Sequence, residues 1–411
     1  MNKPKIRFKG FEGEWKEMQF EVAFEYQRNN SLSRAELSDE GIVANIHYGD
    51  VLIKYGECLD VSKDVLTYVK DKKISMALYK KGALRNGDVI FADAAEDNTV
   101  GKCTEVICEE NVCIVSGLHT IACRPQVEFV ERYLGYSLNS PSFHNQLLPH
   151  IQGTKISSIS KNALSSTSIS LPSLPEQRAI ASYFTSLDAQ IAASTSRLSS
   201  LKQIKAASLL NMFPQKGETE PRVRFKGFQG EWKERKLGEV FSERVENNIN
   251  GQLLSVTLNK GIIRASENGK LDNSNSDKSK YKVVNINDIA YNSMRMWQGA
   301  SGCSKYEGIV SPAYTVITPK EDIDSSFFSY LFKTDIAINK FRLHSQGLTS
   351  DNWNLKYPAF SKIDVYCPLD ISEQRAIASY FTALDAQITL HRERLEKLKQ
   401  IKAACLEKMF A

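Results

Sequence analysis

Two stretches of the chain, residues 175–213 and 372–411, carry apolar side chains at alternating steps of four and three residues. This spacing is typical of a helix that buries one narrow stripe, as in a coiled coil. Neither stretch is interrupted by Gly or Pro between Glu176 and Phe213 or between Glu373 and Phe410. Each therefore predicts one continuous helix of roughly 57 Å, at about 1.5 Å per residue.

A helix with a single apolar stripe must cover it, and we expect the two helices to cover each other. The stripe residues, which form the expected helix–helix interface, are Ile180, Phe184, Leu187, Ile191, Leu198 and Leu201 in the first helix and Ile377, Phe381, Leu384, Ile388, Leu395 and Leu398 in the second. The alternative is that each helix packs only onto its own domain.

The two helical stretches are copies of each other. Glu176–Phe213 and Glu373–Phe410 are identical at 27 of 38 positions, and the segments that begin at Pro4 and Pro221 are identical at 11 of 14. A repeat of this length is too long for a solenoid and indicates two domain-sized halves. The expected division is a first domain at 1–174, a first helix at 175–213, a linker at 214–220, a second domain at 221–371 and a second helix at 372–411.

The regions between the copied segments share landmarks although their sequences differ. Strand-like apolar runs at 86–91 and 120–122 match runs at 287–291 and 315–317, and each half then has a Gln-Gly pair and a short alternating strand. These patterns predict two α/β domains of one fold, separated by two long helices packed as an antiparallel coiled coil. A pseudo-twofold duplication of this kind suggests one scaffold that presents two different surfaces.

Composition and charge add few constraints. The chain has 42% apolar and 25% charged residues and a formal net charge of +5, which permits but does not require a polyanionic partner. No run approaches the roughly 18 apolar residues of a membrane span. Eight cysteines are too sparse for a disulfide scaffold. We therefore expect a cytoplasmic protein that does not bind a membrane.

Motifs for catalysis are missing from the sequence. We find no phosphate-binding loop, dinucleotide-binding, zinc-protease or serine-hydrolase motif, and expect neither a catalytic residue nor a metal site. Cys103, Cys108, Cys113 and Cys123 lack the tight pair of a zinc site and are interpreted as small core residues. His391, which interrupts the second stripe, is interpreted as a polar residue that fixes the helix register. The pattern favours binding over chemistry.

Polar loops that contain glycine are the best candidates for a binding surface, because guanidinium, amide and carboxylate groups can contact base edges. The alternative for each residue is an ordinary surface loop. The candidate DNA-binding residues are Asp93, Glu96, Lys102, Gly153, Thr154 and Lys155 in the first half and Arg295, Trp297, Gln298, Gly347, Ser350 and Asn352 in the second.

The duplicated E-Q-R-A-I-A-S-Y-F…L-D-A-Q-I helix, which follows a Gln-Gly loop and a strand in each half, resembles the specificity subunit of type I restriction–modification systems. The opening segments F-K-G-F-x-G-E-W and the runs 294–299 and 117–120 share this resemblance, which covers essentially the whole chain. It implies that each domain reads one half of a split, asymmetric DNA target. It also implies that the helices set the spacer and dock two methyltransferase subunits.

The resemblance further implies that the chain itself is not an enzyme and holds no cofactor. S-adenosylmethionine, ATP and Mg would belong to partner subunits, namely the methyltransferase subunits and restriction subunits with translocase activity. Two alternatives from other classes remain at this point. One is a structural adaptor that binds proteins across a helical rod, and the other is an enzyme with an unrecognised metal site.

Overall fold

The computed structural model describes residues 3–109, 111–153, 155–258, 260–268, 277–349 and 352–411. The chain divides into two compact units, which we call unit 1 (Met1–Thr195 with Glu393–Ala411) and unit 2 (Ser196–Arg392). This division differs from the expected one, which treated the helices as segments of their own. Each unit instead contains the beginning of one long helix and the end of the other.

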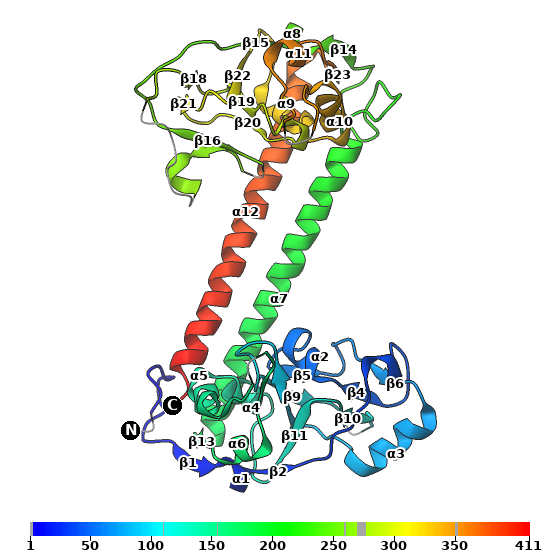
Figure 1. Ribbon diagram of the computed structural model, residues 1–411, viewed down its shortest axis with the longest axis vertical. Helices are drawn as coiled ribbons and strands as arrows, with labels where there is room; N and C mark the ends of the chain where they lie inside the picture. The colour runs from blue at the N-terminus through cyan, green and yellow to red at the C-terminus, as the bar shows by residue number, and fades with distance from the viewer. Residues whose placement is uncertain (1–2, 110, 154, 259, 269–276, 350–351) are drawn as a thin grey trace. The chain divides into compact units, whose positions relative to one another are not determined.

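Unit 1 is an α/β domain with a five-stranded sheet, a four-stranded sheet and several short helices (Figure 1). The larger sheet has the strand order β2 (Phe24–Tyr26), β11 (Thr120–Pro125), β7 (Val89–Ala92), β9 (Cys103–Ile107) and β5 (Cys58–Asp60). The smaller sheet has the order β10 (Ile114–Ser116), β4 (Ala44–Ile46), β6 (Tyr68–Val69) and β3 (Leu37–Ser38). The helices are α2 (Tyr48–Ile53), α3 (Lys72–Gly82), α4 (Tyr133–Leu138), α5 (Pro141–Leu147) and α6 (Lys161–Ser165), with α1 (Phe20–Ala23) near the start.

Unit 2 repeats the central sheet of unit 1. Its four strands have the order β15 (Phe241–Glu243), β22 (Tyr314–Pro319), β19 (Ile289–Asn292) and β20 (Ser301–Cys303). Two strand pairs accompany the sheet, β16 (Leu254–Thr257) with β17 (Gly261–Arg264) and β18 (Lys282–Val284) with β21 (Gly308–Val310). The helices are α8 (Leu237–Val240), α9 (Ser325–Leu331), α10 (Asp335–His344) and α11 (Tyr357–Phe360). The prediction of two α/β domains of one fold is therefore confirmed.

The same turn opens the central strand β7 or β19 in both units. Asp88 is fully buried and accepts hydrogen bonds from the backbone of Arg85 and the guanidinium of Arg124. In unit 2, Asp288 accepts from the backbone of Asn285 and the guanidinium of Arg244. A buried carboxylate is tolerated only when it is paired and hydrogen-bonded, so this aspartate requires an arginine in each unit.

The copied segments pair at the base of each unit. The opening segment contributes β1 (Lys16–Gln19) and β14 (Lys233–Lys236), which pair antiparallel with β13 (Ser168–Leu171) and β23 (Asp364–Cys367), the strands that precede the long helices. Buried Glu176 and Glu373 in the first helical turns bind Arg7 and Arg224 of the opening segments. The identical residues of the two copies thus form one anchor that occurs twice.

The long helices are α7 (Leu174–Asn211) and α12 (Ile371–Lys408), each of 38 residues. In unit 1, Asp188 of α7 binds Lys402 of α12, and in unit 2, Lys205 of α7 binds Asp385 of α12. A second contact joins Tyr183 to Cys405 in unit 1 and Ser208 to Tyr380 in unit 2, so residue numbers fall along α12 as they rise along α7 and the helices pack antiparallel within each unit, as predicted. None of the described helices is long and apolar enough to cross a membrane.

The stripe residues are divided between two environments. Phe184 and Phe381 are fully buried in the cores of units 1 and 2 and stack on Tyr136 and Tyr330, so the start of each stripe packs onto its own domain. Ile180 and Ile377 belong to the same cores. The stripe residues farther along the two helices are buried outside these cores, namely Leu187, Leu198, Leu201, Leu384, Ile388 and Leu395. Ile191 and Leu398 are half-buried. At the first turns, the domain therefore covers the stripe together with the end of the other long helix.

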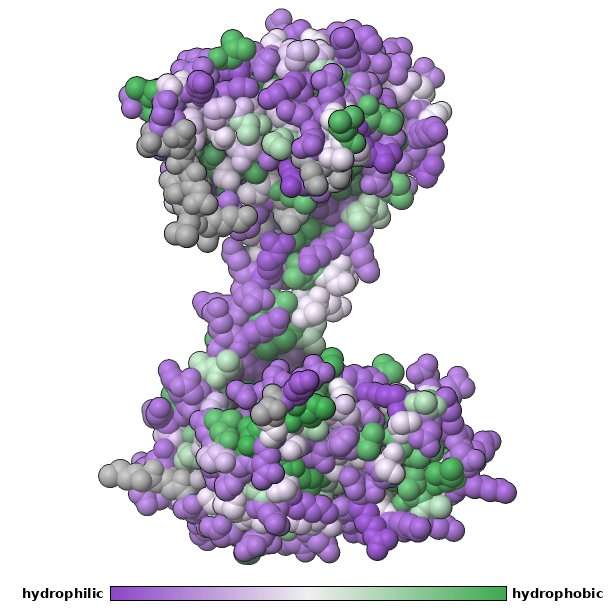
Figure 2. All heavy atoms as spheres, viewed as in Figure 1, coloured by the Kyte–Doolittle hydropathy of each residue, from purple (hydrophilic) through white to green (hydrophobic). Residues whose placement is uncertain are grey.

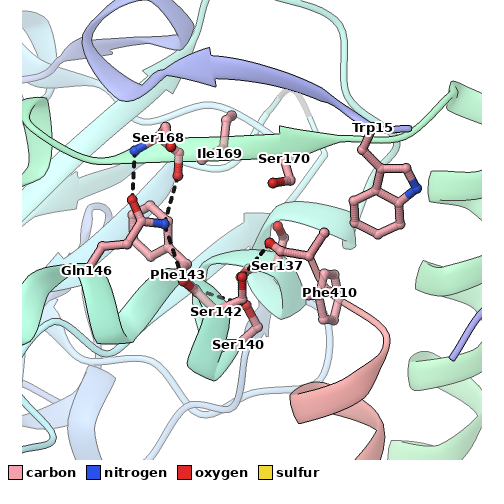
Figure 3. Close-up of a pocket in the computed structure, with 11 residues that line it drawn as sticks. Trp15, Ser137, Ser140, Ser142, Phe143, Gln146, Ser168, Ile169, Ser170 and Phe410 are labelled. Atoms are coloured by element: carbon pink, nitrogen blue, oxygen red, sulfur yellow. Dashed lines mark hydrogen bonds between the residues drawn. The ribbon is translucent and has the colours of Figure 1, made fainter. Parts of the chain in front are cut away.

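The end of each helix is buried in the unit where the other helix begins. Phe410 stacks on Phe184 in unit 1, and Phe213 packs against Phe381 and Trp232 in unit 2. Figure 3 shows Phe410 lining a small pocket of unit 1 together with Trp15 and the serines of the α4–α5 region. This exchange of helix ends explains why the units divide the helices instead of leaving them separate.

Replacing Phe213 with Ala should destabilise unit 2 by about 3–5 kcal/mol, because it leaves a cavity among buried aromatic rings. The measurement is equilibrium unfolding in urea, followed by tryptophan fluorescence. The matched control is Leu210→Ala, three residues earlier in the last turn of α7, whose side chain is half exposed. Equal losses for the two variants would contradict the proposed anchor.

Candidate nucleic-acid interface

The two candidate loops of unit 1 lie side by side. The strand β8 (Ala94–Ala95) pairs antiparallel with β12 (Ser157–Ser158), and the backbone nitrogen of Ile159 donates to the carbonyl oxygen of Asp93 at 2.9 Å. The loop after β7 and the Gln-Gly loop are thus joined into one surface, although about 60 residues separate them in the sequence.

The glycine of each Gln-Gly loop is required by the turn. Gly153 has φ +104°, and a Cβ atom there would lie 2.0 Å from the carbonyl oxygen of Ile156. Gly347 has φ +143°, and a Cβ atom would lie 2.6 Å from the carbonyl oxygen of Asn352. Only glycine fits both the backbone angle and the space, so each unit requires glycine at this position of its Gln-Gly loop.

Asp93 forms a polar pair with His119 at the edge of this surface. The Nδ1 atom of His119 lies 3.1 Å from Oδ1 of Asp93, and the imidazole packs edge-on against the ring of Tyr48 at 5.3 Å between centroids. Burial raises the pKa of Asp93, although His119 opposes the shift. The His119 side chain is half exposed, so this edge presents an imidazole and a phenol to solvent.

The structure gives Lys102 a different role from the expected one. Its ammonium group donates to the carbonyl oxygens of Leu52 and Tyr55, at 2.9 and 3.0 Å, and so caps the end of α2. Burial lowers the pKa of Lys102. Because the ammonium group points into the unit, its placement does not support a contact with DNA. Glu96 and Lys155 are exposed, as is Gly153, and Thr154 lies outside the described residues.

The two candidate loops of unit 2 are also brought together. The ring of Trp297 packs edge-on against Trp353, with 5.3 Å between centroids, and the backbone nitrogen of Leu355 donates to the carbonyl oxygen of Ser293. Gln346 and Asn354 pair across the base of the Gln-Gly loop. The indole N–H of Trp297 donates to Met294, so this ring is fixed in place.

The polar candidates of unit 2 extend from this aromatic base into solvent. Arg295, Gln298 and Asn352 are exposed, and within the described part of the chain none of their side chains has a hydrogen-bond partner. Gly347 is exposed in the turn, and Ser350 lies outside the described residues. One guanidinium and two amides are therefore available on one surface.

Lys333 supports this surface from beneath. Its ammonium group donates to the carbonyl oxygens of Gly299, directly after the short 3₁₀ helix η4 (Met296–Gln298), of Ser301 at the start of β20, and of Leu258 after β16. Burial, together with the nearby ammonium group of Lys205, lowers the pKa of Lys333 to about 8. The group fixes the end of η4, which carries Trp297 and the exposed Gln298.

Comparisons with known proteins agree with this architecture. The family model described as "Type I restriction modification DNA specificity domain" matches residues 12–203 and 229–400. The chain belongs to this family. It therefore recognises a DNA target through two domains and works in a complex with other restriction–modification subunits.

Among solved structures, the S subunit of a type I restriction–modification system from M. genitalium is similar over 100% of this chain and 99% of that chain, with 14% identity and a TM-score of 0.62. The HsdS subunit from Thermoanaerobacter tengcongensis matches with 15% identity, 96% coverage of each chain and a TM-score of 0.45. A chain described in terms of complex assembly and conformational transition of the type I R-M system matches at 14% identity, 95% and 96% coverage and a TM-score of 0.49. No curated protein matches.

The loop surfaces of both units include two residues that were not among the candidate DNA-binding residues of the sequence. Tyr48 and Lys333 reach these surfaces from α2 and from the end of α9, respectively. In the sequence, the run His47-Tyr48 directly after a buried strand could have indicated a binding residue at Tyr48. A lysine after a helix, such as Lys333, is too common to indicate one. Among the described residues, no group of three or more His, Cys, Asp or Glu is placed to hold a metal ion.

Replacing Lys333 with Gln should weaken base discrimination by unit 2 roughly 10-fold, because hydrogen bonds from a charged donor to three carbonyls are lost. The measurement is competition binding with duplexes altered in one half of the target at a time. Discrimination in the other half should not change. The control is Lys340→Gln on the next helix, whose ammonium donates to the carbonyl oxygen of Asp364, away from these loops. A matching loss in both variants, or in both halves, would refute the positioning role.

Proposed function

We propose that the joined loops of each unit read the bases of one half of a split, asymmetric DNA target. The observation that carries this proposal is the equivalent pairing of loops in the two units. In each, a Gln-Gly turn lies against the loop that follows the central strand β7 or β19. The scaffold is common and the exposed side chains differ, as two different half-sites require.

The side chains of unit 2 fit direct readout in the major groove. The guanidinium of Arg295 can donate two parallel hydrogen bonds to guanine, and the amides of Gln298 and Asn352 can pair with adenine in the same bidentate way. The Trp297–Trp353 pair provides a rigid apolar base for these groups. In unit 1, the carboxylate of Glu96 suits the amino group of cytosine, and Lys155 suits a phosphate.

The long helices are proposed to set the unspecified spacer between the half-sites. Half-sites read from one face of DNA lie about one helical turn, roughly 34 Å, apart. A helix of 38 residues is roughly 57 Å long and is therefore sufficient for this spacing. The support for this role is that both helices are continuous and that both are anchored at their two ends.

The chemistry is proposed to reside in partner subunits within the cytoplasm. Two methyltransferase subunits would supply S-adenosylmethionine and act on adenine, and restriction subunits would supply ATP-dependent, Mg-dependent translocation and cleavage. Exposed apolar residues on the long helices support docking there, because Ile204, Leu210 and Leu390 are 43%, 49% and 64% exposed. This chain would contribute recognition and no catalytic residue.

The test is selection of bound sequences from a random duplex pool by the chain co-expressed with its methyltransferase subunits. A bipartite motif with a fixed spacer is expected. Arg295→Ala should relax one or two positions of one half-motif by about 5- to 150-fold, since a good bidentate contact is worth about 1–3 kcal/mol. Arg222→Ala, an exposed arginine paired with Glu218 in the linker region, is the matched control.

Exchange of residues 1–174 for the same domain of another family member should change one half-motif and leave the other unchanged. Movement of both halves together would contradict one reader per unit. An adaptor protein, the competing function, would select no motif from the pool at all.

A further inference from the structure

The positive charge of this chain is concentrated at one helix of unit 1. Residues 70–85 contain six Lys or Arg residues and a single acid, Asp71, so this segment has a formal charge of +5. The whole chain also has a formal charge of +5, and the remaining residues are therefore neutral in sum. In unit 2, the sequence between β17 and β18, residues 265–281, has three lysines and three acids and no net charge.

Four of the lysines lie on one side of α3. At about 100° per residue, Lys72, Lys73, Lys80 and Lys81 fall within about 180° of the helix circumference. Ser75, which is buried, lies on the opposite side. No acidic residue shares the lysine side, so it forms a continuous cationic face, which we call the α3 lysine face.

Packing does not account for this face. The helix α3 lies at the outer edge of unit 1, beyond β6 and β10, and Ser75 is its only buried residue (Figure 1). Within the described part of the chain, none of the four ammonium groups has an ion-pair or hydrogen-bond partner. The N-terminus of the helix is capped by Asp71. Hydrophilic residues make up much of the surface visible in Figure 2.

We propose that the α3 lysine face is a second DNA contact, which binds backbone phosphates independently of sequence and lies outside the base-reading loops. The inference rests on the DNA-reading function proposed above. Duplex DNA carries one negative charge per about 1.7 Å of its axis, so a row of free ammonium groups complements it. The two lysine pairs are about 12 Å apart along the helix, which allows contact with more than one phosphate.

The side chains of the face indicate phosphate contact instead of base readout. Lysine is a point charge that suits phosphate, whereas reading bases usually requires Arg, Asn or Gln with fixed donor geometry. The only other residues on this side are Met76 and Ala77. The face is therefore expected to add affinity without adding preference for a sequence.

The test compares the full chain, co-expressed with its methyltransferase subunits, with a variant in which Lys72, Lys73, Lys80 and Lys81 are replaced by Gln. Binding is measured from low to physiological salt on the selected target duplex and on a duplex of equal length with both halves scrambled. Because each phosphate contact contributes about −0.9 to the slope of log K against log salt, the slope should become shallower by about 2–4. The ratio of affinities for the two duplexes should stay within about twofold.

The matched control replaces Lys9, Lys16, Lys226 and Lys233 by Gln. These exposed lysines occupy equivalent places in the two opening segments, and the control removes the same total charge. Its slope should change by less than about 1, since no clustered phosphate contact is lost. Circular dichroism and thermal unfolding of both variants check that the fold is retained.

Three outcomes would overturn the inference. One is a salt slope equal to that of the control, and another is a changed preference between the two duplexes, which would make α3 a base reader. The third is unchanged DNA binding together with lost subunit assembly, which would assign the face to an acidic protein surface. Failure of the base-reading proposal is distinguishable from all three, because the unmodified complex would then bind both duplexes equally.

Discussion

Each unit of this protein is completed by a phenylalanine at the end of a helix that begins in the other unit. Phe410 enters the aromatic core of unit 1, and Phe213 enters that of unit 2. Burying a side chain of this size contributes about 1.5–3 kcal/mol, a substantial part of the stability of one domain. The fold of each half therefore depends on the helix supplied by the other, and the two long helices must remain paired and antiparallel.

The charged contacts of the helix pair repeat with the same symmetry. Lys402 binds Asp188 and Glu57 in unit 1, while Lys205 binds Asp385 in unit 2. Burial alone would lower the pKa of Lys402, but the two carboxylates hold it above its ordinary value. Truncation of one partner would leave a half-buried charge unpaired, so these pairs disfavour other registers of the helices. The copied residues of the sequence are accordingly those that hold the helices to each other and to their domains.

The side chains of the exposed loops differ between the two units, although the sheet beneath them is shared. Both loops require glycine, at Gly153 and Gly347, whereas the neighbouring surface is acidic and imidazole-containing in unit 1 and guanidinium- and indole-containing in unit 2. Because the strands beneath these loops pair in the same order, side chains in the loops can change without loss of core packing. A split target with unlike halves is the kind of ligand that such an arrangement suits.

The sequence by itself determined the duplication, the two long helices, the α/β character of both halves and the pairs of loops, because periodicity and repetition are local properties of the chain. It did not determine that Lys102 points inward, that Phe184 belongs to a domain core, or that Lys333 supports a loop more than 30 residues before it. Nor did it show the division of both helices between the units. These features depend on which distant segments are neighbours, and an ammonium group or an aromatic ring acquires its role only from the carbonyls and side chains that the tertiary structure places around it.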